Sequence, residues 1–219
     1  MITKIFKNHH LRFALFGAAL ALLPLLTQAR ILRVSMLTTV ASALIYAIAA
    51  MGMNLLLGYA GQISLGAAGF MGLGAYLAGY VPVGLSQNFW ISLLIALVVP
   101  TFIGILVGFV SLRIAGIYLA IATLCVSEIL LKTFEEFEEF TGGMSGMKGL
   151  GYPVVFGNTL TRETMYWVLV IALVLIMMLT YNLVNGQFGR ALHAMRGSES
   201  AAQAMGVNLL KYRLIVFAL

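Results

Sequence analysis

The residues most able to do chemistry in this chain are concentrated near its C-terminal end. From Asn185 to Arg213 the sequence is NGQFGRALHAMRGSESAAQAMGVNLLKYR, which holds four Lys and Arg residues and a single acid, Glu199. Ser198 is a residue type that caps helices, Glu199 suits a first helical turn, and Gly206 suits the position after a last turn. The stretch therefore predicts a helix of about two turns on a basic loop that meets a partner in water.

A second group of polar residues lies in a glycine-rich stretch from Met51 to Tyr80. The sequence there is MGMNLLLGYAGQISLGAAGFMGLGAYLAGY. Backbone that leaves the helix inside a membrane is tolerated only where it lines a protected cavity. The candidates for lining a translocation path are Asn54, Gly58, Gln62, Ser64 and Gly66. Hydrogen bonding between helices is the alternative role for the three polar side chains.

The remaining glycines of this stretch predict close helix packing. Gly69, Gly72 and Gly79, with Ala68 and Ala75, are small residues of the kind that let two helix backbones approach. A phosphate-binding loop is the alternative for GYAGQISLG. That segment lacks the Lys-Ser/Thr ending of a P-loop and lies among apolar residues, so phosphate binding is disfavoured.

Charged residues elsewhere form no catalytic or metal-binding pattern. The sequence has no Asp and no cluster of His, Cys and carboxylates at metal-ligand spacing, so it predicts no catalytic residue, metal, cofactor or enzyme activity. Glu128 lies in an apolar run four residues before Lys132. This spacing favours a structural ion pair over a proton or solute site.

An aromatic stripe follows that pair. Phe134, Phe137 and Phe140 recur every three residues among four glutamates, a pattern typical of a short amphipathic turn. Such a stripe packs on neighbouring helices or on the membrane surface. Docking of an external partner on the acids is the alternative.

The elements that must position these residues are membrane helices. Hydrophobic residues make up 62% of the 219 and charged residues 9%, where soluble domains have roughly 25% charged residues. Spanning helices need about 20 predominantly apolar residues, and the predicted spans are 13–29, 34–57, 64–85, 89–112, 114–131 and 164–184. We therefore expect an all-α fold, a polytopic integral-membrane helical bundle with a glycine-rich broken or re-entrant segment, in a single transmembrane domain over residues 1–219.

The distribution of cations predicts the orientation of the chain. With the N-terminus inside and six crossings, eight of the 13 Lys and Arg residues lie on the cytoplasmic side. This places the loop 185–213 in the cytoplasm and the acidic loop 133–163 outside. The net charge of +6 is explained by these loops, so nucleic-acid binding is not expected.

The last residues predict the start of a further helix. Residues 214–219 are LIVFAL, an apolar run after Arg213 that covers only about 9 Å and cannot cross a bilayer. We therefore expect the printed chain to stop inside an element, as a fragment or a truncated product would.

Three segments together resemble a known family. GYAGQISLGAAGFMGLGAY, TGGMSGMKG and GRALHAMRGSESAAQAMGVNLLKYRLIVFAL occur in the order and spacing of the branched-chain amino-acid ABC transporter permeases, most closely the M-type subunit. The resemblance implies a multi-pass permease domain in the inner (plasma) membrane of a bacterium. It also implies four kinds of partner: a second permease subunit, cytoplasmic ATPase subunits, a periplasmic or extracellular solute-binding protein, and an amino-acid substrate.

The resemblance also assigns the basic loop. Glu199, Ala201, Ala202 and Gly206 match the family's EAA-type pattern, which implies contact with the ATPase. ATP hydrolysis is then expected in a separate subunit. Two alternatives stay open: an ion-coupled secondary transporter that uses Glu128, and a membrane subunit for assembly that does not itself transport.

Overall fold

A computed structural model of the chain describes residues 9–28, 34–84, 89–111, 114, 116–148, 150, 154–155 and 158–219. Almost all of the regular structure in these ranges is helical, and one short antiparallel ladder joins β1 (Val154–Val155) to β2 (Asn158–Thr159). The predicted all-α membrane bundle is confirmed. The chain divides into two compact units, Met1–Gly52 with Leu160–Gly189 and Met53–Thr159 with Arg190–Leu219. Each unit is described by itself.

The first unit contains four helices: α2 (His9–Ala21), α3 (Leu23–Gln28), α4 (Val34–Met53) and α9 (Arg162–Asn185). The predicted span 13–29 is interrupted at Leu22, where α2 ends and α3 begins. Pro24 explains the interruption, because proline has no N–H to donate to the carbonyl four residues earlier, at Leu20. The Tyr166 hydroxyl of α9 donates to that carbonyl at 3.2 Å, so the exposed acceptor is satisfied.

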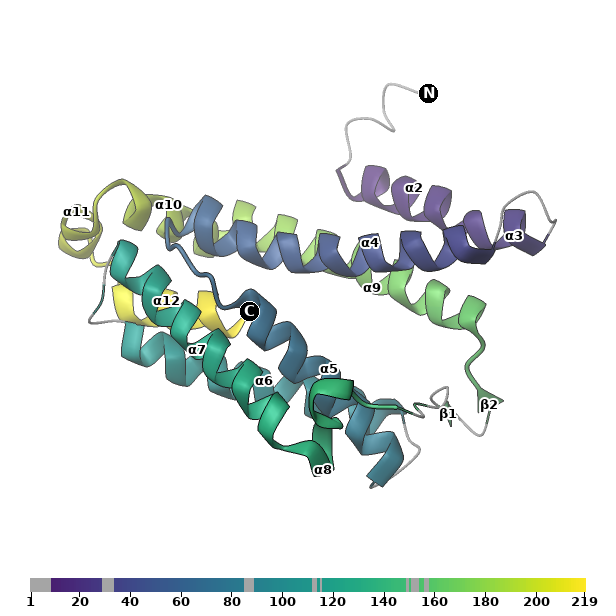
Figure 1. Ribbon diagram of the computed structural model, residues 1–219. Helices are drawn as coiled ribbons and strands as arrows, with labels where there is room; N and C mark the ends of the chain where they lie inside the picture. Colours follow the sequence, from purple (N-terminus) through teal and green to yellow (C-terminus); the bar gives the residue numbers. More distant parts are fainter. Residues whose placement is uncertain are drawn as a thin grey trace, which may run out of the picture. The chain divides into compact units, whose positions relative to one another are not determined.

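The core of this unit lies between α4 and α9 (Figure 1). Gly17 of α2 faces α9 and leaves the space that a Val174 methyl group occupies. The buried core side chains are Leu37, Leu44, Tyr166, Val170 and Leu173.

The second unit holds the glycine-rich stretch and the C-terminal segment. Its elements are η1 (Asn54–Tyr59), α5 (Ala67–Gly84), α6 (Phe89–Ser111), α7 (Ile117–Glu136), α8 (Glu138–Thr141), η2 (Gly143–Ser145), α11 (Glu199–Ala204), α12 (Leu209–Ala218) and, from Arg190 on, α10 (Gln187–Gly197). Here α5 packs against both α6 and α7, and α12 packs on α6. The α6–α12 approach depends on Gly104 and Gly108, since a Cβ at Gly104 would lie 2.8 Å from the Phe217 carbonyl oxygen.

The predicted close packing of helices is confirmed at Gly69 and Gly72, which meet α7, whereas Gly79 meets side chains of the segment after η2. A Cβ would lie 2.8 Å from Ser127 Cα at Gly69, 2.9 Å from the Phe134 ring at Gly72, and 2.9 Å from Met147 Sδ at Gly79. The prediction is wrong for Ala68 and Ala75, which are exposed in this chain.

Five described helical stretches are long and apolar enough to cross a membrane: His9–Thr27, Ser35–Tyr59, Phe89–Val110, Ile117–Glu136 and Arg162–Asn185. They correspond to five of the six predicted spans. The sixth prediction, 64–85, falls on α5, whose crossing of the membrane stays a prediction. The predicted span ends at residues 29, 85 and 112 lie outside the described residues.

The segment 185–213 contains more helix than the sequence predicted. α10 occupies Gln187–Gly197, and α12 begins at Leu209 rather than at residue 214. The Asn208 side chain caps α12 by accepting from the Lys211 N–H at 3.1 Å. The basic loop is therefore a helix–helix–helix segment with short connections.

Candidate functional site

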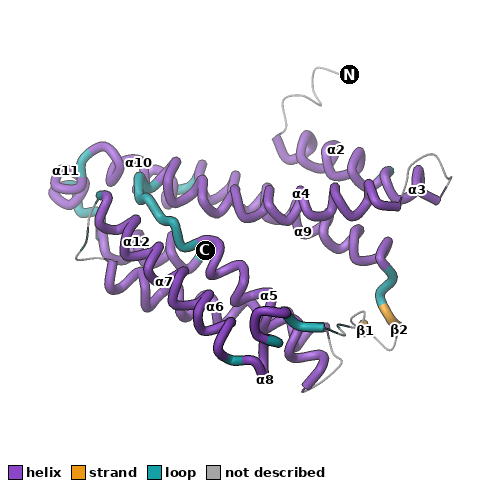
Figure 2. The backbone as a smooth tube through the Cα atoms, in the orientation of Figure 1, coloured by secondary structure: helices purple, strands orange, loops and turns teal. Residues whose placement is uncertain are grey.

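The helix is broken in the glycine-rich stretch, as predicted. After the π-helical turn η1, residues 60–66 are not helical, and α5 then begins at Ala67. Figure 2 shows this interruption as a loop that leads into α5. Gly61 has φ +67°, a left-handed conformation that favours glycine. Single π-turns inside membrane helices occur frequently at functional sites.

Two hydroxyl groups of α7 hold the broken segment. Thr123 Oγ1 accepts from the Leu65 N–H at 2.9 Å, and Ser127 Oγ accepts from the Gly69 N–H at 3.0 Å. Both hydroxyl residues are buried. They satisfy backbone donors that a helix break would otherwise leave without partners in an apolar medium.

Sequence reasoning missed Thr123 and Ser127. A signal was present, because hydroxyl residues four apart share one face of a helix and lie here inside an apolar run. Their partners are backbone N–H donors 58 residues away in the chain, which no local pattern reveals.

The predicted path residues differ in exposure. Gln62, Ser64 and Gly66 are buried, whereas Asn54 is exposed and Gly58 is half-buried. The Ser64 hydroxyl accepts locally from the Gly66 N–H at 3.4 Å, so it does not bridge two helices. Asn54 Oδ1 occupies the space that a Cβ on Gly58 would need.

Gln62 is distinctive among these residues. Its side chain is 8% exposed, and among the described residues its Oε1 has no hydrogen-bond partner. A buried polar acceptor without a partner costs about 1–3 kcal/mol. Such a cost is tolerated where the group serves a ligand.

The predicted short helix in the C-terminal segment is confirmed as α11. The Ser198 hydroxyl accepts from the Ala201 N–H at 3.3 Å and caps the first turn. At the other end Gly206 has φ +85°, and the N–H of Val207 bonds to the Ala202 carbonyl at 3.0 Å. This is a Schellman termination, in which glycine takes the left-handed position.

The four predicted ATPase-contact residues do not share one surface. The Glu199 carboxylate pairs with the guanidinium of Arg213 on α12, whose side chain is only 10% exposed. Ala202 is buried, while Ala201 and Gly206 are exposed. Within this set only Ala202 is buried. Glu199 pairs with Arg213 but keeps 52% of its side chain exposed, so it remains accessible to a partner, as Ala201 and Gly206 do.

Met205, next to Gly206, was not predicted as a contact residue. Its side chain is 85% exposed at the end of α11. An exposed methionine is adaptable and is common on surfaces that bind partners.

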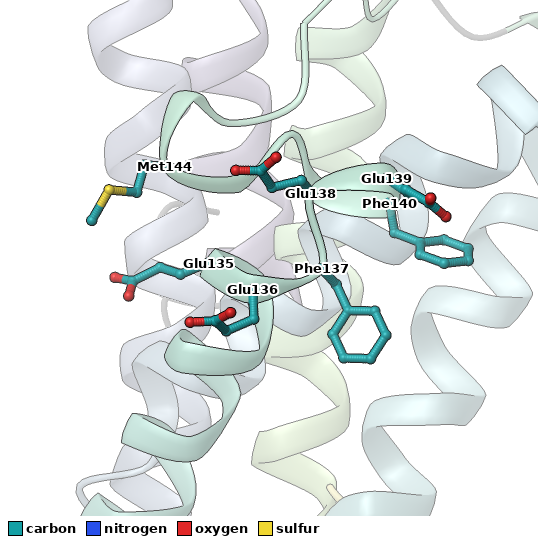
Figure 3. Close-up of a pocket in the computed structure, with 7 residues that line it drawn as sticks. All are labelled: Glu135, Glu136, Phe137, Glu138, Glu139, Phe140 and Met144. Atoms are coloured by element: carbon teal, nitrogen blue, oxygen red, sulfur yellow. The ribbon is translucent and has the colours of Figure 1, made fainter.

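An acidic cavity of about 620 Å³ follows α7 (Figure 3). In Figure 3 the side chains of Glu135, Glu136 and Glu138 point to one side, and those of Phe137, Glu139 and Phe140 point to the other. Its lining residues are Glu135, Glu136, Phe137, Glu138, Glu139, Phe140 and Met144.

The ion pair predicted near this cavity is wrong in its partner. Lys132 Nζ lies 2.5 Å from Glu135 Oε2, and Glu128 makes no ion pair among the described residues. Glu135, three residues after Lys132, takes the ammonium group that the sequence prediction gave to Glu128.

The aromatic stripe packs on α5, as predicted. Phe134 is buried against Tyr76, with ring centroids 4.8 Å apart, and Phe140 meets Tyr80 at 4.9 Å. Phe137 is 57% exposed, because the chain breaks there between α7 and α8.

The described residues contain no group of three or more His, Cys, Asp or Glu side chains that could hold a metal ion. The site is thus built from backbone groups, hydroxyls and one amide.

Comparison with known proteins defines the family. Residues 35–219 match the family described as the branched-chain amino acid transport system / permease component, and the chain belongs to that family. Together with the five candidate spans, this places the chain in the inner (plasma) membrane.

Two relatives illustrate the similarity. The chain is 30% identical over 200 residues to the high-affinity branched-chain amino acid transport system permease protein LivM of Salmonella typhimurium, and 29% identical over 200 residues to LivM of Escherichia coli. Each match covers 80% of this chain and 47% of the relative, so the chain spans about half the length of these relatives. No solved structure matches the chain.

Proposed function

We propose that the chain is a membrane permease subunit of an ATP-binding-cassette importer for branched-chain amino acids. The observation that carries the proposal is the family match over residues 35–219, which includes both the broken helix and α11. Its partners are a second permease subunit, cytoplasmic ATPase subunits and a periplasmic or extracellular solute-binding protein. The permease itself does no chemistry, and ATP hydrolysis takes place in the ATPase subunits.

In this proposal α11 is the contact with the ATPase. Its caps at both ends make it a rigid unit, and its exposed side includes Ala201, Met205 and Gly206. Glu199 and Ala202 then act within the permease, by fixing α11 to the rest of its compact unit.

The path for the solute runs along the break at residues 60–66. Asn54, Gly58, Gln62, Ser64 and Gly66 are its proposed lining. A zwitterionic amino acid is suited to such a lining, because backbone dipoles and amide groups can hold it without formal charges. The Gln62 Oε1 supplies an acceptor for the ammonium group.

Uptake in vesicles tests the function. The full-length chain, purified with its partner subunits and reconstituted, is expected to accumulate radiolabelled leucine only when ATP and the binding protein are supplied. Uptake that stops with a collapsed proton or sodium gradient and continues without ATP would instead support the ion-coupled alternative. A complex that retains the ATPase yet carries no solute would support the assembly role.

Replacement of Gln62 tests the path. Gln62→Leu is expected to weaken solute transport on the order of tenfold, since the acceptor is lost. Thermal stability is expected to stay the same or rise, because a buried unpartnered group is removed. Gln187→Leu, at an exposed glutamine of α10, is the matched control. Unchanged leucine uptake in Gln62→Leu would remove this residue from the path.

A further inference from the structure

α10 contacts the broken helix through an arginine. Arg196 Nη1 donates a hydrogen bond to the carbonyl oxygen of Gly58 in the last turn of η1. The aliphatic part of the same side chain lies against Gly61, where an added Cβ would be 3.1 Å from Arg196 Cγ. The arginine therefore contacts the segment both before and inside the break.

The Gly58 carbonyl is a suitable acceptor for this arginine. The chain leaves the helix after Tyr59, so carbonyls of the last turn lack the donors that a continuing helix would supply. Helix C-termini also carry partial negative charge, which favours a cation. Guanidinium groups stay protonated in proteins, so this donor is permanent.

A second contact lies beside the first. The rings of Tyr59 and His193 meet edge to face, with centroids 5.2 Å apart. His193 and Arg196 are three residues apart and so share one face of α10. Two neighbouring residues of η1, Gly58 and Tyr59, are thus both held by that face.

One face of α10 is buried. Leu192 is 0% exposed and Met195 4% exposed, and they lie on the face next to that of His193 and Arg196. A single residue, Ser198, separates α10 from α11. Its N–H bonds to the Ala194 carbonyl of α10 at 3.1 Å, while its hydroxyl caps α11. The two helices are therefore joined through one residue that bonds to both.

We propose that Arg196 is a positioning residue that links the ATPase-contact helix α11 to the break at residues 60–66. Movement of α11 is carried through Ser198 and α10 to the Gly58 carbonyl, and it changes the backbone geometry that faces the solute. This rests on the proposed function of an ATP-driven permease. It adds a named route, within one compact unit, between the ATPase surface and the path.

The test measures transport and ATP hydrolysis in the same vesicles. In the reconstituted complex with the full-length chain, Arg196→Gln is expected to lower the amount of leucine carried per ATP hydrolysed on the order of tenfold, as for loss of a charge-assisted hydrogen bond. ATP hydrolysis itself should continue. Arg196→Lys keeps the cation and should restore part of the ratio. Arg190→Gln, at an exposed arginine of the same helix, should leave the ratio unchanged.

Several results would overturn the inference. If Arg196→Gln keeps the wild-type ratio, or lowers uptake and hydrolysis in equal proportion, Arg196 has no role in coupling. If Arg196→Gln does not assemble, His193→Ala decides: a lowered ratio supports the link, and an unchanged ratio refutes it. Failure of the proposed function is distinguishable, because wild-type uptake would then not depend on ATP.

Discussion

The break at residues 60–66 and the short helix α11 are held in opposite ways. α11 is capped by its own neighbours, with Ser198 at one end and Gly206 at the other. The break is held by hydroxyls of α7 that lie 58 residues away in the chain. An element with local caps can move as a rigid body. A break supported by a neighbouring helix changes shape when the two helices shift.

Reversal of the charge at Glu199 is expected to have the largest effect. Glu199→Arg would place a cation beside Arg213, whose side chain is mostly buried, so the contact between α11 and α12 would become repulsive. We expect solute-stimulated ATP hydrolysis to be lost while the protein still inserts into the membrane. Normal stimulated hydrolysis in this variant would show that α11 does not depend on α12.

Glycine replacement in α5 comes next. Gly69→Ala would bring a Cβ to 2.8 Å from the Ser127 backbone, which must then move. We expect destabilisation of about 1–3 kcal/mol, as for an overpacked core, seen as a lower melting temperature of the purified complex. Gly52→Ala is the control, because a Cβ there meets nothing within 4 Å and alanine favours helix. Equal melting temperatures for the two variants would contradict the close α5–α7 packing.

Loss of a hydroxyl tests the support of the break more directly. Thr123→Val keeps the shape of the side chain but leaves the Leu65 N–H without its acceptor, at a cost of about 1–3 kcal/mol. Hydrogen exchange at residues 60–66 is expected to become faster. Thr123→Ser retains the hydroxyl and should exchange like the wild type. The support would be disproved if valine and serine behaved alike.

Removal of the local cap should have the smallest effect. Ser198→Ala is expected to cost α11 about 1 kcal/mol, since one N-terminal N–H loses its acceptor. The change should appear as faster hydrogen exchange in residues 199–204 and not in residues 60–66. Ser198→Asp, another capping residue, should restore protection. Faster exchange at the break in Ser198→Ala would mean that the cap of α11 also supports the hydrogen bonds of the break.

The predictable part of this molecule was the part controlled by neighbours in sequence. Ser198 and Gly206 flank one short helix, and their residue types alone predicted where α11 begins and ends. Gly58 to Gly66 predicted a departure from helix for the same reason. α10 was missed because its glycines and charges resemble a loop, while the burial of Leu192 and Met195 stabilises it as a helix.

Functional roles were less predictable than elements. Glu128 was paired with Lys132 by spacing, yet the structure pairs Lys132 with Glu135. Ala202 matched a contact pattern but is buried. Spacing along one helix resolves neither which acid pairs with Lys132 nor which face of α11 is buried.

The sequence by itself determined that the chain lies in a membrane, that it folds as an all-α bundle, where the helix breaks and how α11 is capped. These follow from hydropathy and from interactions over a few residues, which act before any long-range contact forms. Only the tertiary structure decided that Thr123 and Ser127 support the break and that Arg196 meets the Gly58 carbonyl 138 residues away in the chain. The two hydroxyls accept from backbone N–H groups, and Arg196 donates to a backbone carbonyl. Every residue except proline carries both groups, so the sequence alone does not reveal which of them is the partner.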